Sequence, residues 1–265
     1  MVYHGDPDQL ISVPVRWIVY TVAGLPFAAL VICIALSILL HWDEATATHC
    51  GVANWLPSIS AAVASYSPER YIWRVFISLH AAPRYVAAIA FRNYLLTSPL
   101  WSPSDVWWYP VACHALCAVQ FAENTFLLLL TSVSSTENYL IHKISFSAFA
   151  VCAIIYMLSA TWIFQFSGRN RTSPLGERSL QYKILMCWAS LTALACSLYF
   201  FYRHNTYCEP GIYSFFAISE YALVLSNILF HSTLFFDFHG KRLMMSSFGS
   251  LPEYEVLNRV VAKQT

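Results

Sequence analysis

Three apolar segments of the sequence carry polar side chains at spacings that fit one face of a helix. The narrowest stripe lies in residues 212–236, where three polar residues are seven and four positions apart: Glu220, Asn227 and His231. At about 100° per residue they share a single face. Ionisable side chains at bilayer depth are expensive, and they normally face a bundle interior or a water-filled cavity. The stripe therefore predicts a polar site inside the molecule.

The other two segments supply partners for this stripe. Residues 71–92 contain Arg74, His80 and Arg84 within an arc of about 120°, and residues 107–131 contain Glu123 and Asn124. Two interpretations are open. In the first, Arg74 snorkels to the surface and Arg84 pairs with Glu123, so that these groups serve packing alone. In the second, they line a cavity where the planar arginine fork binds an anionic head group while lipid tails lie among the helices.

The composition indicates that these segments cross a membrane. The chain has 265 residues, of which 58% are hydrophobic and 11% charged, and its mean hydropathy is +0.53; a soluble domain has about 25% charged residues. Six apolar stretches approach the ~20 residues that span a bilayer: 17–41, 71–92, 107–131, 140–165, 184–202 and 212–236. We therefore predict an all-α polytopic membrane protein with six transmembrane helices, forming a single transmembrane domain over residues 1–265. The net charge of +1 argues against nucleic acid as a partner.

The distribution of basic residues predicts the orientation. The first stretch could be a signal peptide, but it is longer than the roughly 7–15 apolar residues of a signal core, so we predict a retained helix. With the N-terminus in the cytoplasm, that side receives Arg16, Arg92, Arg169, Arg171, Arg178, Lys183, Lys241, Arg242, Arg259 and Lys263. The opposite side receives only Arg70, Lys143 and Arg203. Residues 1–16 and the tail 240–265 are then cytoplasmic, and 42–70 form a long lumenal loop.

Two of the eight cysteines, Cys50 and Cys208, fall in the predicted lumenal loops. That side is oxidising in the secretory pathway, so we predict a Cys50–Cys208 disulfide, the alternative being two free thiols. The other cysteines lie in apolar segments as packing residues and lack partner ligands at metal-site spacing. We predict no metal site.

The long loop is itself half apolar. Trp55, Leu56, Ile59 and Val63 recur at near-helical spacing, which predicts a short helix lying at the membrane interface. Such a helix could be a lid over a cavity or a structured connector.

Four separated motifs, "ATHCGVANWLPSIS", "RYIWRVFISLHAAPRY", "YFFYRHNTYCEPGIYSFFAISEY" and "VLSNILFHSTLFFDF", closely resemble the post-GPI-attachment-to-proteins factor two family. These six-helix membrane proteins are related to the DRAM autophagy modulators. The resemblance covers about residues 40 to 240, while residues 1–15, 98–108, 167–182 and the tail match poorly. It implies fatty-acid remodelling of glycosylphosphatidylinositol (GPI) anchors in the Golgi membrane, and also the endoplasmic reticulum membrane, with GPI-anchored proteins and membrane lipids as partners.

In the remodelling step that this family serves, a lyso-GPI intermediate receives a saturated chain at its sn-2 position. One hypothesis is that the chain is the O-acyltransferase, with acyl-CoA or a phospholipid as co-substrate and no cofactor. The other is a non-catalytic lipid-binding or adaptor protein that presents or sorts lyso-GPI-anchored proteins. The resemblance leaves the oligomeric state open.

Acyl transfer to a hydroxyl needs a general base and donors for the developing oxyanion. The residue types suggest catalytic roles for His80 as base and for Glu220, Glu123 and His231 beside it. They suggest substrate binding by Arg74, Arg84, Arg203, His204, Asn124 and Asn227. Because no G-x-S-x-G motif is present, we expect direct attack by the lipid hydroxyl rather than a serine acyl-enzyme.

Overall fold

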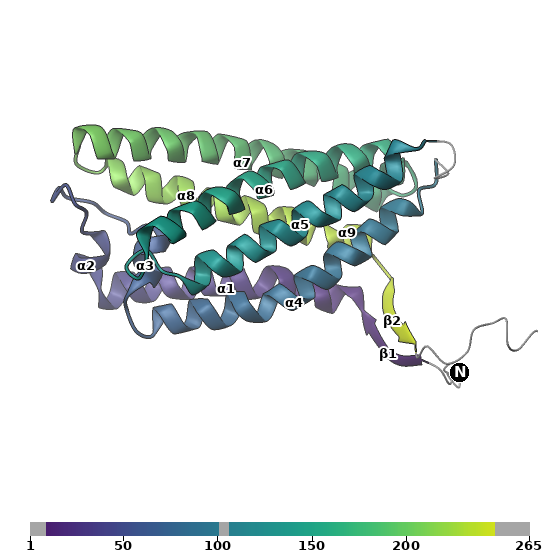
Figure 1. The fold of residues 1–265 in the computed structure, drawn as a ribbon, viewed down its shortest axis with the longest axis horizontal. Coiled ribbons are helices and arrows are strands. Elements are labelled where there is room, and N and C mark those ends of the chain that lie inside the picture. Colours follow the sequence, from purple (N-terminus) through teal and green to yellow (C-terminus); the bar gives the residue numbers. More distant parts are fainter. Residues whose placement is uncertain (1–8, 101–105, 247–265) are drawn as a thin grey trace, which may run out of the picture.

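The computed structural model describes residues 9–100 and 106–246. Its body is a bundle of six long helices (Figure 1). They are α1 Val15–Leu40, α4 Glu69–Leu96, α5 Trp108–Ser132, α6 Tyr139–Phe166, α7 Pro174–Tyr207 and α8 Ile212–Ser232. A one-turn helix, α9 Leu234–Asp237, follows α8. Each apolar stretch of the sequence corresponds to one of these long helices, the last of them continuing into α9, so the all-α prediction holds for the bundle.

Five helical segments of the described chain are long and apolar enough to cross a membrane: α1, α5, α6, α7 and the α8–α9 segment Ile212–Asp237. The outer surface carries large apolar side chains, among them Trp17, Val151, Trp188 and Leu198, each more than half exposed. Such a surface suits lipid rather than water. The chain is therefore a polytopic helical membrane protein.

Helix α7 is longer than its apolar stretch predicts. Ser173 caps its first turn by accepting from the amide of Gly176, and Pro174 occupies the first helical position, as is common there. The helix therefore begins ten residues before the apolar stretch 184–202. One of them, Lys183, is 1% exposed, and its ammonium lies 2.7 Å from Asp237. Lys183 is therefore a buried helix residue paired with Asp237, although the sequence counted it only as a charge on the cytoplasmic side.

The ends of the described chain meet at one end of the bundle. Strand β1, Gln9–Pro14, pairs antiparallel with strand β2, Arg242–Ser246, with Ser12 opposite Met244 (Figure 1). The sequence did not predict this ribbon, because two short strands far apart in the chain give no helical or extended periodicity of useful length. We call this the ribbon end.

At the opposite end, the connection between α1 and α4 folds over the bundle. It contains α2, Trp42–Thr46, and α3, Ile59–Ala64 (Figure 1). Ser58 caps α3 by accepting from the amide of Ala61. The predicted short helix is present, in contact with α1, α4 and α8. We call this the α3 end.

Candidate functional site

A cavity runs through the bundle beneath α3. The space that it offers to water-sized molecules amounts to about 70 Å³. Most of its wall is apolar: Val22, Pro26, Ile59, Val63, Ala64, Trp73, Ile77, Leu127, Leu130, Phe146, Phe149, Val224 and Ile228. Polar side chains gather at two levels. Glu220 and His231, both on α8, mark these levels, and eleven residues of helix separate them by about 16 Å.

The inner level is the deep cluster, formed by Arg84, Glu123, Asn227 and His231. Nη2 of Arg84 donates to Oε1 of Glu123 at 2.5 Å and to Nε2 of His231 at 2.6 Å. Nδ2 of Asn227 donates to the same carboxylate at 2.8 Å. All four side chains are buried. Since arginine can only donate, Nε2 of His231 accepts from Arg84, and Oε1 of Glu123 lies 3.4 Å from the same nitrogen.

This geometry pairs Arg84 with Glu123, as the packing interpretation expects. The guanidinium charge is compensated inside the bundle, so Arg84 is not a free cation for a phosphate. Two further buried polar residues, Asn124 and His80, contact backbone carbonyls of α4. Nδ2 of Asn124 donates to the carbonyl of Ala81 at 3.0 Å. Nδ1 of His80 lies 2.6 Å from the carbonyl oxygen of Ile77.

His80 is fully buried, and it does not line the cavity. Its Nε2 has no hydrogen-bond partner among the described residues. A catalytic role for His80 stays a prediction, which this placement does not favour.

The outer level is the outer cluster, formed by Ser60, His142 and Glu220. Oε2 of Glu220 accepts from the amide of Ile59 at 2.7 Å, and Oε1 lies 3.5 Å from the hydroxyl of Ser60. Nε2 of His142 also lies 3.5 Å from that hydroxyl. Ser60 and His142 are part-buried, whereas Glu220 is 3% exposed. The sequence identified Glu220 but missed the other two.

None of the described contacts of Glu220 is with an arginine. Its partners come from α3, a segment 160 residues earlier in the chain. Only the position of α3 beside the start of α6 in the folded chain brings Ser60 and His142 together. Neither residue stands out in its own segment.

Arg74 and Arg203 lie outside the cavity lining. Arg74 donates to Glu137 at 2.7 Å and to the carbonyl of Ser132 at 3.0 Å, which fastens the turn between α5 and α6. The amide of Ser134 and then the Arg74 guanidinium lower the pKa of Glu137 to about 2. Arg203 pairs with Glu209 at the end of α7. The structure does not bring these two arginines to the deep cluster.

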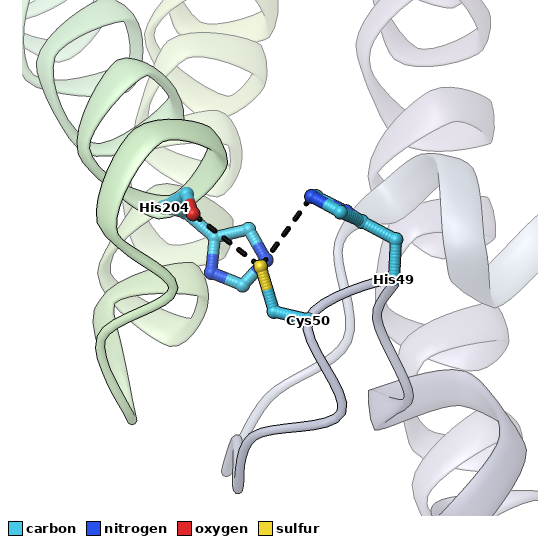
Figure 2. A group of neighbouring side chains, drawn as sticks. All are labelled: His49, Cys50 and His204. Atoms are coloured by element: carbon cyan, nitrogen blue, oxygen red, sulfur yellow. Dashed lines mark hydrogen bonds between the residues drawn. The ribbon is translucent and has the colours of Figure 1, made fainter.

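Cys50 and Cys208 form a disulfide that joins the loop before α3 to the turn between α7 and α8. His49 and His204 stand on either side of Cys50, and the ligand atoms of the three residues lie within 4.8 Å of one another (Figure 2). A cysteine binds a metal as a thiolate, and the bonded sulfur of Cys50 has none to offer. The predicted substrate-binding residue His204 thus packs at the disulfide, away from the cavity lining.

A second buried ion pair lies at the ribbon end. Nζ of Lys183 donates to Asp237 at 2.7 Å and to Ser179 at 2.6 Å, and the hydroxyl of Ser179 donates to the other oxygen of Asp237 at 2.6 Å. The ammonium lies 4.4 Å from the centre of the Phe164 ring. These groups satisfy one another and line none of the described cavities, so we assign them to the packing of α7 against α9.

The fold and its cavity define the class: a polytopic helical membrane protein with a largely apolar internal cavity and titratable groups at two depths. Residues 14–241 match the family model described as "Frag1/DRAM/Sfk1/Cwh43P N-terminal domain". The chain belongs to this family, and within it to the post-GPI attachment to proteins factor 2 group.

Its relatives support that placement. "Post-GPI attachment to proteins factor 2" of Caenorhabditis briggsae is 51% identical over 259 residues, covering 97% of this chain and 98% of the relative. "Acyltransferase PGAP2" of Xenopus tropicalis is 40% identical over 226 residues, covering 85% and 88%. "Protein cwh43" of Schizosaccharomyces pombe is 25% identical over 83% of this chain but only 21% of its own length. No solved structure shows a significant match.

Proposed function

We propose that the protein is a membrane O-acyltransferase that places a saturated chain on the sn-2 hydroxyl of lyso-GPI anchors. The cavity carries this proposal: most of its wall between the two polar levels is apolar, as an acyl chain requires, and hydroxyl, imidazole and carboxylate groups meet at its outer end. The name of the Xenopus tropicalis relative, an acyltransferase, points the same way.

We infer that α4 also spans the membrane, giving six transmembrane helices. Its 28 residues correspond to about 42 Å, and it packs against α1 and α5 within the bundle. Its low apolar content comes largely from charges that find partners: Arg84 pairs inside the bundle and Arg74 at the α5–α6 turn.

We propose that both termini are cytoplasmic and that the α3 end, with residues 42–70, faces the lumen. The basic residues of the ribbon end and the disulfide at the α3 end support this orientation. The compartment would be the Golgi membrane, with the endoplasmic reticulum as a second location. The substrates would be GPI-anchored proteins and an acyl donor, either acyl-CoA or a phospholipid.

The test uses the purified protein in nanodiscs, supplied with lyso-GPI and a labelled acyl donor. The proposal expects labelled diacyl product without any other protein. Tight binding of lyso-GPI with no turnover for either donor would overturn it in favour of a presenting or sorting protein.

A further inference from the structure

The outer cluster places a hydroxyl beside an imidazole whose tautomer is fixed. Nδ1 of His142 lies 2.8 Å from the carbonyl oxygen of Val133, which can only accept. The ring proton therefore sits on Nδ1. In the neutral ring, Nε2 then presents a lone pair, and it points at the hydroxyl of Ser60, 3.5 Å away.

The support of Ser60 is equally specific. Glu220 accepts from the amide of Ile59, the residue before Ser60, and so ties the start of α3 to α8. Tyr221 donates from its hydroxyl to the carbonyl of Pro57, just before α3. Two contacts from α8, of which the one from Glu220 is buried, thus hold the segment that carries Ser60.

Ser60 and His142 both line the cavity and are both part-buried, so a bound acyl group can reach them. A hydroxyl, a base within reach and a third group orienting the base are the components of an activated nucleophile. The distance of 3.5 Å is long for proton transfer, as is common before substrate binds.

We propose that Ser60 and His142 form a nucleophile–base pair that carries the acyl group as an ester on Ser60. This inference rests on the proposed acyltransferase function and makes the transfer a two-step reaction. The sequence led us to expect direct attack by the lipid hydroxyl, because no G-x-S-x-G motif is present. The serine proposed here lies on a short helix, which that motif does not describe.

In the first step, Oγ of Ser60 bonds to the carbonyl carbon of a thioester or phospholipid ester. Its proton passes to Nε2 of His142, the bond from the carbonyl carbon to the donor sulfur or oxygen breaks, and the leaving group takes that proton. In the second step, the hydroxyl of the lyso-lipid attacks the Ser60 ester and gives its proton to His142. The ester bond to Ser60 breaks, and Ser60 regains the proton.

The experiment separates the two steps. Purified protein in nanodiscs is given each labelled donor without acceptor, and intact and peptide mass spectrometry locates the adduct; lyso-GPI is then added and product is measured. We expect one acyl group on Ser60, lost in S60A and replaced by a hydroxylamine-labile thioester in S60C. Transfer by S60A should fall by about 100-fold or more.

H142N removes the base while its amide can still donate to the Val133 carbonyl, so we expect the same loss with unchanged thermal stability. S65A is the matched control: Ser65 directly follows α3 and lies outside the cavity lining, so this variant should keep both adduct and transfer. Full transfer by S60A with no adduct in the wild type overturns the pair and leaves the acyltransferase standing. If the wild type forms no adduct and transfers no chain with either donor, both the Ser60–His142 pair and the acyltransferase proposal are overturned.

Discussion

The two buried carboxylates of the site, Glu123 and Glu220, have different partners. Replacing each by glutamine should therefore lower the free energy of unfolding by different amounts. Glu123 balances Arg84, so E123Q leaves a buried guanidinium without a counterion and should lower the free energy of unfolding by about 3–5 kcal/mol. Glu220 accepts from a backbone amide and faces a hydroxyl. A glutamine can satisfy both, so E220Q should cost about 1 kcal/mol or less. Thermal unfolding in detergent measures both; equal losses would contradict the assignment.

For single residues, the sequence predicted which of them turn inward and one of their contacts, the Arg84–Glu123 pair, but not the partners of Glu220. Helical periodicity placed Glu220, Asn227 and His231 on one face, and all three are buried. It could not predict that Glu220 meets α3, because that contact depends on how a loop folds over the bundle. The sequence did not identify His142 and Ser60 as site residues for the same reason, since each is an ordinary polar residue within its own segment.

Among the elements, α3 positions the outer cluster and depends on a close contact at the α7–α8 turn. The amide of Gly211 donates to the carbonyl of Ala53 at 2.8 Å, and a Cβ at Gly211 would lie 2.6 Å from the Trp55 ring. Gly51 has a similar positive φ but nothing within 4 Å of a Cβ.

G211A should therefore displace the loop, whereas G51A should cost only the backbone strain of about 1–2 kcal/mol. Limited proteolysis of residues 47–58 and thermal unfolding compare the two variants. Faster cleavage in G211A than in G51A is the expected result. Identical behaviour would show that Trp55 does not hold the loop.

Element boundaries followed the apolar stretches closely except where caps extend a helix beyond them. Helix α1 begins and ends within two residues of its stretch, but α7 starts ten residues early at its Ser173 cap. Hydropathy reports the part of a helix that meets lipid, and α7 continues past that part with a buried Lys183.

For the whole molecule, pairing of β1 with β2 requires both ends of the described chain to lie on one side of the membrane. Epitope tags at the two termini should both be digested when protease is added to intact microsomes. Asn170, in the sequon Asn170-Arg171-Thr172 near the ribbon end, should carry no sugar. A protected tag, or an endoglycosidase-sensitive glycan at Asn170, would contradict the proposed orientation.

If transfer occurs with the acyl chain inside the cavity, its rate should depend on the length of that chain. Ile228 lines the cavity beside Asn227 and is 7% exposed, so I228F fills the deep end. Leu229, the next residue, is 49% exposed, and L229F is the matched control.

The measurement is the transfer rate of purified protein for a series of saturated donors, from short to long. We expect I228F to keep the transfer of short chains and to transfer long chains about tenfold more slowly or worse, while L229F matches the wild type. An I228F variant that folds normally and transfers every chain length at the wild-type rate, or loses all lengths equally, would contradict this expectation.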